Sequence, residues 1–220
     1  MSKALTIFES LDNNEIVIAF LKKLFTSEKV EPDIMKYLIV GLGNIGSEYD
    51  NTRHNIGFEI LDFLAKQKEV EFENDHLGAL ATFKFKGRTF VMLKPNTYMN
   101  LSGKSVRYWL QKHNVKMENL LVVLDDLNLP YEKMRMRKKG KDGGHNGLKD
   151  IDRVLGQNNY ARLRFGIGNQ YSKGQQVDFV LGEWTVEEEQ AIGPLKEKAC
   201  KAILAFGTIG AGRAMSEFNK

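Results

Sequence analysis

The 220-residue chain contains one cysteine, Cys200, and has no long apolar run. A single thiol excludes an intrachain disulfide and a thiolate metal cluster, so we expect a reducing compartment. No apolar stretch approaches the roughly 18 residues of a membrane-spanning helix. Together these absences predict a cytoplasmic protein without a membrane partner.

The common motifs of covalent and metal-assisted hydrolysis are also missing. There is no G-x-S-x-G nucleophile elbow, and Cys200 lies in a helical stretch without a neighbouring histidine, so covalent catalysis by serine or cysteine is poorly supported. The histidines, His54, His76, His113 and His145, form no H-x-x-x-H or H-E-x-x-H pair. We therefore expect no metal site.

What the chain does contain is typical of a globular domain. Hydrophobic residues make up 42% of it and charged residues 27%, and both values lie near the averages for globular proteins. A chain of this length is expected to fold as one domain with a sizeable core. Its net charge of +4 is uneven: residues 1–34 carry four lysines and six acidic residues, or −2, which leaves +6 for residues 35–220.

The acidic segment 1–34 is predicted to be an N-terminal extension of the main domain, 35–220. Its apolar patch predicts a short amphipathic helix from about residue 13 to 27, with disorder as the alternative. Acidic rather than basic residues precede this patch, which argues against a signal peptide or a mitochondrial transit peptide. Met35 is an alternative natural start.

From Met35 onwards, strand-like and helix-like patterns alternate. Strands are predicted at residues 37–40, 82–85, 89–93, 120–124 and 160–167. Helices are predicted at residues 56–66, from a Ser102 cap to His113, at 148–155, and over much of the C-terminal stretch after the acidic turn 187–189. This order predicts an α/β fold, a single three-layer domain with a mixed, twisted sheet flanked by helices on both faces.

The stretch Gly41–Gly46 matches the dinucleotide motif G-x-G-x-x-G directly after a predicted strand. That motif requires a helix to begin at its third glycine, so that the helix N-terminus meets the pyrophosphate. Here the polar run 47–55 follows instead. A dinucleotide oxidoreductase is therefore a weak alternative, and the glycines are better explained by a loop that passes close to another part of the chain.

Polar side chains gather after the predicted strands, where α/β proteins place their sites. The segments concerned hold Asn44 and residues 52–55, then residues 96–100, then Asp125 and Asp126, and finally residues 143–147. Each segment alone is also explained as a turn. Together they predict one pocket with two histidines, an aspartate and several amides, which suits hydrolysis by a histidine-activated water. Such a base suits an ester better than an amide, because an alkoxide leaves without a protonated nitrogen.

A run of basic residues precedes the last of these segments. It contains no acid and consists of Lys133, Arg135, Arg137, Lys138, Lys139 and Lys141. Met134 and Met136 alternate with the first of them, which predicts a strand with one buried face. The bland interpretation is a solvated surface. Because the run leads directly into residues 143–147, we favour phosphate binding beside the chemistry, with RNA recognised through its backbone rather than by stacking.

Six sequence blocks, in order, resemble those of the bacterial peptidyl-tRNA hydrolases. The resemblance runs from Lys36 to about the C-terminus, and its blocks lie at residues 36–44, 49–57, 94–103, 125–130, 143–151 and 162–168. It departs from the family where Ile45 replaces a usual proline, which could loosen Asn44, and where Asn128 stands in place of a more frequent aspartate.

The resemblance implies a cytoplasmic, monomeric esterase that cleaves peptide from peptidyl-tRNA and needs no metal or other cofactor. It implies that His54 is the base that activates water and that Asp125 orients this imidazole. The residues that it implies for substrate binding are Asn44, Tyr49, Asn100, His145 and Asn146. Those that it implies for tRNA phosphate contacts are Arg135, Arg137, Lys138, Lys139, Lys141 and Arg164. The alternative from another class is a non-catalytic RNA-binding relative, like the plant organelle splicing factors of this fold.

Overall fold

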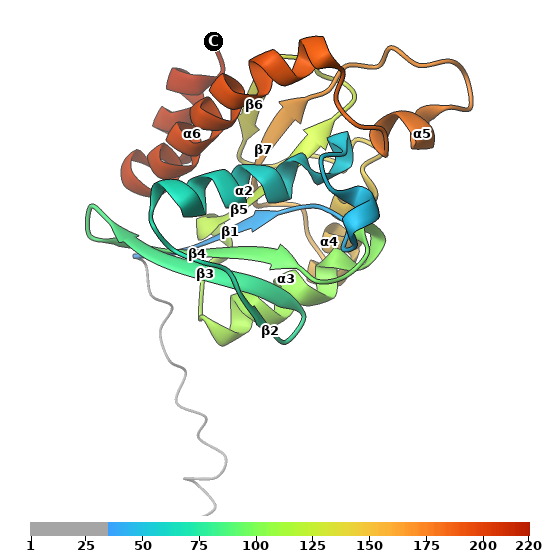
Figure 1. Ribbon diagram of the computed structural model, residues 1–220. Coiled ribbons are helices and arrows are strands. Elements are labelled where there is room, and N and C mark those ends of the chain that lie inside the picture. The colour runs from blue at the N-terminus through green and yellow to red at the C-terminus, as the bar shows by residue number, and fades with distance from the viewer. Residues whose placement is uncertain (1–34) are drawn as a thin grey trace, which may run out of the picture. The chain divides into compact units, whose positions relative to one another are not determined.

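The computed structural model describes residues 35–220 (Figure 1). The predicted N-terminal helix at residues 13–27 lies outside the described residues, so the division of the chain at residue 34 stays a prediction. The described part is built around a seven-stranded sheet with the order β2-β3-β4-β1-β5-β7-β6. Its strands are β1 Lys36–Gly41, β2 Glu73–Asp75, β3 Gly78–Phe85, β4 Arg88–Pro95, β5 Leu120–Asp126, β6 Met134–Arg137 and β7 Ala161–Gly166.

The sheet is mixed, and its four central strands run parallel. Strand β1 pairs in parallel with β4 on one side and with β5 on the other, and β5 pairs in parallel with β7. Both edges of the sheet are antiparallel: β3 pairs antiparallel with β4 and with β2 at one edge, and β6 pairs antiparallel with β7 at the other. The parallel strands β4, β1, β5 and β7 therefore bring their carboxyl ends to one edge of the sheet, where a site is expected.

Helices cover both faces of this sheet. The helices are α2 Ile56–Gln67, α3 Ser102–Lys112, α4 Asn146–Leu155, α5 Gln176–Val180 and α6 Val186–Phe218. Short 3₁₀ turns join several elements: η1 Ser47–Tyr49, η2 Arg53–Asn55, η3 Met99–Leu101 and η4 Met117–Asn119. In Figure 1, α2 and α6 lie on one face and α3 and α4 on the other. The predicted α/β fold with three layers is confirmed.

The core is divided between the two faces by the alternation of side chains along each strand. In β1, Ile39 packs in the cluster that contains residues of α2 and α6, whereas Leu38 and Val40 pack in the cluster that contains Trp109 of α3 and Ile151 of α4. All of these side chains are buried. Each contributes about 1.5–3 kcal/mol of transfer free energy, so the two layers together hold the parallel strands in place. No helix within residues 35–220 is long and apolar enough to cross a membrane.

One local prediction, at the start of α3, needs correction, and one short strand was not predicted. Ser102 does not cap the helix: its hydroxyl donates to the Met99 carbonyl at 2.9 Å, and the N-cap residue Leu101 makes no side-chain hydrogen bond. The Gly103 backbone N–H donates instead to Oδ2 of Asp150 in α4, at 2.8 Å. The reason is that the 3₁₀ turn η3 runs directly into α3, so Ser102 already has helical backbone angles instead of the extended ones of an N-cap residue. The short strand β2 was not predicted, because its three residues are exposed and carry no apolar alternation.

Other predicted features are confirmed in detail. In β6, Met134 and Met136 are buried while Arg135 and Arg137 are exposed. The long C-terminal helix with an acidic first turn is present as α6. It begins with a capping box, which was not predicted: the Thr185 hydroxyl accepts from the Glu188 backbone N–H and the Glu188 carboxylate accepts from the Thr185 backbone N–H. Such a box satisfies N–H groups that the first helical turn leaves unpaired.

The glycines of the Gly41–Gly46 stretch serve a close approach of backbones. Gly46 is followed by the 3₁₀ turn η1 rather than by an α-helix, so the dinucleotide interpretation is wrong. A Cβ on Gly41 would lie 2.3 Å from the Gly57 carbonyl oxygen, and a Cβ on Gly57 would lie 2.4 Å from the Leu42 backbone. The start of α2 therefore rests directly on the end of β1, which places the preceding turn, η2, above the carboxyl ends of the strands.

We predict that Gly57→Ala lowers the free energy of unfolding by about 1–3 kcal/mol, because its methyl group would be forced into the Leu42 backbone. The matched control is Gly193→Ala, also within a helix, where a Cβ meets nothing within 4 Å. That change should leave stability unchanged or raise it by up to about 1 kcal/mol. Denaturant unfolding of the three proteins checks this, and an equal effect of both substitutions would contradict the close-approach explanation.

Candidate active site

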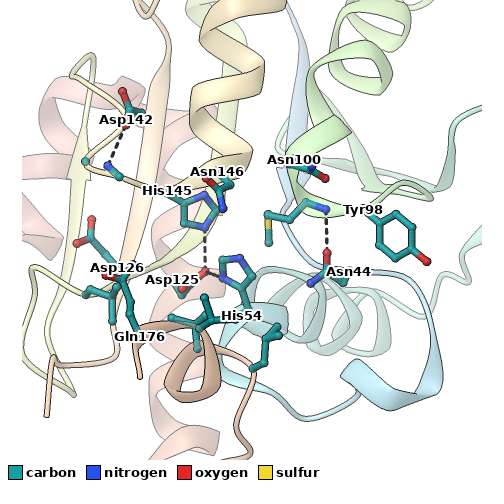
Figure 2. Close-up of a pocket in the computed structure, with 17 residues that line it drawn as sticks. Asn44, His54, Tyr98, Asn100, Asp125, Asp126, Asp142, His145, Asn146 and Gln176 are labelled. Atoms are coloured by element: carbon teal, nitrogen blue, oxygen red, sulfur yellow. Dashed lines mark hydrogen bonds and ion pairs between the residues drawn. The ribbon is translucent and has the colours of Figure 1, made fainter. Parts of the chain in front are cut away.

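A cavity of about 330 Å³ opens at the carboxyl ends of the parallel strands. Its wall is made by loops after β1, β4 and β5, by the η2 turn, by the start of α4 and by α5 (Figure 2). Segments far apart in sequence therefore meet here, as the polar residues at strand ends predicted. The cavity contains both imidazoles of interest, a buried carboxylate and three asparagines.

Asp125 is the centre of the cavity's polar network. It is the last residue but one of β5, and its side chain is 2% exposed. Its Oδ1 atom lies 2.9 Å from Nδ1 of His54 and 2.9 Å from Nε2 of His145. Figure 2 shows the two imidazoles converging on this one oxygen, and their ring centroids lie 5.0 Å apart. One carboxylate thus orients two rings.

The hydrogen bonds assign the tautomer of each imidazole. Nδ1 of His145 accepts from the backbone N–H groups of Gly147 and Leu148, at 3.2 and 3.4 Å, and so caps α4. The proton of His145 therefore resides on Nε2 and is donated to Asp125. His54 donates from Nδ1 to the same carboxylate, which leaves its Nε2 lone pair available. Within residues 35–220 no hydrogen-bonding partner occupies that Nε2 atom, and His54 lines the cavity.

Burial and charge oppose one another in this network. Burial by itself would raise the pKa of Asp125, but the His54 and His145 imidazoles hold that pKa well below its usual range. For His54, burial lowers the pKa, whereas the charge of Asp125 and the hydrogen bond to it raise the pKa by more, so the net result lies above 6.5. The carboxylate is therefore ionised at neutral pH, and it stabilises a proton on His54.

Asn44 is held rigidly at the cavity wall. Its backbone N–H donates to Asn55 Oδ1 at 2.8 Å, and its carbonyl accepts from Asn55 Nδ2 at 3.0 Å. Its own Oδ1 accepts from the Met99 backbone N–H at 2.8 Å. Three hydrogen bonds thus fix Asn44, so the loosening expected from Ile45 at the next position is not seen. Its Nδ2 is left without a hydrogen-bonding partner in the described part of the chain.

Asn100 and Asn146 complete the amide lining. Asn100 belongs to η3 and Asn146 is the first residue of α4, and both are exposed members of the cavity wall. Neutral amides in this position can donate to carbonyl oxygens and accept from amide N–H groups. The lining is therefore suited to a peptide-like ligand.

Some predicted site residues lie elsewhere. Tyr49 is half-buried in η1 and does not line the cavity. Five of the basic residues are exposed on β6 and on the segment that follows it, namely Arg135, Arg137, Lys138, Lys139 and Lys141. Arg164 differs from them, because its Nε donates to Asp126 in a close ion pair and its charge is partly compensated.

Sequence reasoning missed the wall that α5 contributes. Gln176, Val177, Val180 and Leu181 line the cavity opposite the asparagines. Helix α5 has only five residues, which is too short to produce a readable helical period. No sequence signal short of a known relative would have identified this wall.

Arg53 anchors that wall beside His54. The Arg53 side chain is 7% exposed, and its guanidinium donates to the Glu183 carbonyl at 2.7 Å, to the Phe179 carbonyl at 3.4 Å and to the Glu188 carboxylate at 2.6 Å. Its backbone N–H donates to the Gly182 carbonyl at 3.1 Å. The segment after α5 is therefore fastened to the turn that carries His54.

The cluster of His54, Asp125 and His145 is compact enough to raise the question of a metal ion, since its potential ligand atoms lie within 4.8 Å of one another. A metal-bound histidine normally donates its second N–H to an acceptor. Nδ1 of His145 instead accepts two backbone N–H groups. Metal binding at Nε2 would require loss of this cap or an anionic imidazole, so the geometry fits a proton-transfer network better than a metal centre.

Comparison with known proteins places this geometry in context. A sequence model of the peptidyl-tRNA hydrolase family matches residues 38–220. The chain belongs to this family. The resemblance inferred from the six sequence blocks is thereby confirmed, and membership identifies the protein as a hydrolase.

Individual relatives agree with this assignment. Peptidyl-tRNA hydrolase of Phocaeicola vulgatus is 54% identical over 186 residues, which cover 84% of this chain and 100% of that protein. The Bacillus subtilis enzyme is 42% identical and covers 83% of this chain and 97% of its own. The crystal structure of peptidyl-tRNA hydrolase from Acinetobacter baumannii superposes with a TM-score of 0.79 at 34% identity, covering 83% of this chain and 94% of that one.

We predict that Asp125→Asn moves the pKa of His54 from above 6.5 to below it, because burial remains while the opposing negative charge is lost. Titration of the imidazole signals by NMR checks this. His113 is an internal control, since burial together with Lys36 and Lys112 lowers its pKa and the substitution leaves these causes intact. An unchanged titration of His54 in the variant would contradict the assigned network.

Proposed function

We propose that this protein hydrolyses the ester bond between peptide and tRNA in peptidyl-tRNA and so returns tRNA for reuse. The observation that carries the proposal is the His54–Asp125 pair at 2.9 Å, with the free Nε2 of His54 at an amide-lined cavity. Its membership of the peptidyl-tRNA hydrolase family supports the choice of substrate.

In the proposed mechanism, His54 acts as a general base. Its Nε2 takes a proton from a water molecule, and the resulting hydroxide attacks the carbonyl carbon of the ester. Asp125 stabilises the imidazolium that forms, as the raised pKa of His54 indicates. The tetrahedral intermediate then breaks its bond to the ribose oxygen, which takes the proton back from His54. The products are a tRNA with a free terminal hydroxyl and a peptide with a free carboxyl group, which ionises by releasing its proton to solvent.

The remaining cavity residues are proposed to hold the substrate. Nδ2 of Asn44 and the amides of Asn100 and Asn146 are placed to bind the peptide backbone around the ester. His145 keeps Asp125 oriented through its 2.9 Å hydrogen bond and borders the space for the terminal ribose. Tyr49 is proposed to contact the tRNA end outside the cavity, from the loop that follows Asn44.

The exposed basic residues are proposed to bind tRNA phosphates. Arg135 and Arg137 lead from β6 toward Lys138, Lys139 and Lys141, and the chain then enters the cavity wall at residue 142. This continuity supports a path for the tRNA acceptor end. Arg164 is proposed to join them by exchanging part of its pairing with Asp126 for a phosphate.

We propose further that the protein acts in the cytoplasm and as a monomer. Residues 35–220 of one chain supply the histidine, the aspartate and the amides of the cavity. No second copy is needed to complete the proposed site.

We predict that His54→Ala slows release of peptide from an N-blocked aminoacyl-tRNA by roughly 10²–10⁴-fold, the usual loss when a general base is removed. The matched control is His76→Gln, because His76 is exposed and lies outside the cavity, and it should retain the wild-type rate. Equal rates for wild type and His54→Ala would contradict the mechanism. Tight tRNA binding by a wild-type protein without turnover would favour the non-catalytic RNA-binding alternative.

Arg135→Ala and Arg137→Ala should each weaken tRNA binding and reduce the slope of log affinity against log salt by about one unit, because each removes one phosphate contact. Lys84→Ala is the control, since Lys84 is an exposed cation on β3, which lies toward the other edge of the sheet from β6. Affinity measured over a range of salt concentrations checks this. If all three variants share the wild-type slope, the basic run is only a solvated surface.

A further inference from the structure

The basic strand β6 is an edge strand. It stands last in the sheet order and pairs with β7 along one side only. An edge strand presents unpaired N–H and C=O groups on its other side, and a strand of four residues is held weakly by one neighbour. The proposed tRNA contacts Arg135 and Arg137 belong to this strand, so whatever fixes the strand also fixes them.

Asn219 closes this edge at its centre. The Met136 backbone N–H donates to Oδ1 of Asn219 at 2.7 Å, and Nδ2 of Asn219 donates to the Met136 carbonyl at 3.0 Å. One side-chain amide thus makes the two hydrogen bonds that a neighbouring strand would make. Met136 is the residue between Arg135 and Arg137, so the pair of bonds acts midway between the two cations.

The end of α6 is shaped to bring Asn219 to this position. Gly210 interrupts the helix with φ 81° and ψ 157°, a conformation that essentially only glycine adopts. Beyond it, Ala214 is buried in the same cluster as Met134 and Met136, and Met215 packs against that cluster. The Asn219 backbone N–H donates to the Met215 carbonyl at 3.1 Å. Figure 1 shows the C-terminus beside β6 at the end of α6.

The consequence concerns the two arginines. Asn219 holds both the N–H and the C=O of Met136, and the Met136 side chain is buried. Because side chains alternate along a strand, Arg135 and Arg137 point to the opposite face, toward solvent. Their Cα atoms are then separated by about 6.7 Å along an extended strand. A fixed strand presents both cations together, whereas a frayed strand would have to be ordered when tRNA binds, which lowers affinity.

We propose that Asn219 is a positioning residue for tRNA recognition: its side-chain amide holds β6 in the conformation in which Arg135 and Arg137 bind phosphate. The inference rests on the proposed function, since it assigns tRNA to these arginines. Asn219 itself is expected to touch neither the tRNA nor the ester.

The test compares two substrates in wild type, Asn219→Ala and the control Gln111→Ala. Gln111 is an exposed amide on α3, so its loss matches the chemical change elsewhere on the surface. One substrate is an N-blocked aminoacyl-tRNA, and the other is the same N-blocked aminoacyl ester on a CCA trinucleotide, which lacks the tRNA body. The affinity for uncharged tRNA is measured in parallel over a range of salt concentrations.

For Asn219→Ala we expect KM for the tRNA substrate to rise about 5-fold with kcat unchanged, and the salt slope to become shallower. Hydrolysis of the CCA ester should be unaffected, as should both activities of Gln111→Ala. The loss of tRNA affinity in the double variant Asn219→Ala, Arg135→Ala should be smaller than the sum of the losses in the two single variants, because both changes act through the same strand.

Two outcomes would overturn the inference. The first is an unchanged KM and salt slope in Asn219→Ala, and the second is an equal loss on both substrates, which would indicate a general loss of structure. Asn219→Asp provides a second variant, since it keeps the acceptor for the Met136 N–H but faces the Met136 carbonyl with an oxygen, and it should behave like Asn219→Ala. Failure of the proposed function itself would be distinguishable, because wild type would then cleave neither ester while tRNA affinity would still report on Asn219.

Discussion

A buried carboxylate that accepts two imidazole hydrogen bonds is the interaction on which the site depends. Asp125 is joined to His54 across 71 residues of sequence and to His145 across 20. An ionised carboxylate that is 2% exposed needs such partners, since unpaired burial of a charge is strongly unfavourable. Satisfying Asp125 therefore requires the η2 turn and the start of α4 to lie within hydrogen-bonding reach of β5, and this requirement organises the cavity.

The fold meets this requirement with backbone geometry rather than with flexible side chains. The absence of Cβ atoms at Gly41 and Gly57 lets α2 rest on β1, which brings His54 over the strand ends. The position of His145 is set by α4, whose first backbone N–H groups bind its Nδ1. Both imidazoles are thus fixed by main-chain contacts, so the tautomers and orientations are determined before any ligand arrives.

The sequence predicted the elements with strong patterns and missed those defined only by tertiary contact. The buried strands and the amphipathic helices were readable because continuous or periodic apolar residues mark them, as in β1 and α2. The gathering of His54, Asp125 and the asparagines followed from their places after parallel strands. In contrast, single side-chain contacts between distant segments leave no periodic signal, as with the bonds of Asn55 to Asn44 and of Arg164 to Asp126. Helix α5, with five residues, is too short to leave one. The Ser102 cap was mistaken because a 3₁₀ turn replaced it.

The attachment of the α5 wall to Arg53 has a consequence for how this protein can diverge. Arg53 holds the segment through the carbonyl oxygens of Phe179, Gly182 and Glu183, groups that every amino acid provides. Side chains such as Val177 and Leu181 face the cavity without serving as attachment points. Substitutions there can alter the shape and polarity of the wall while its tether stays intact. This part of the cavity can therefore change its lining without losing its attachment, whereas Asn44 is tied through its own side chain to the Met99 backbone N–H.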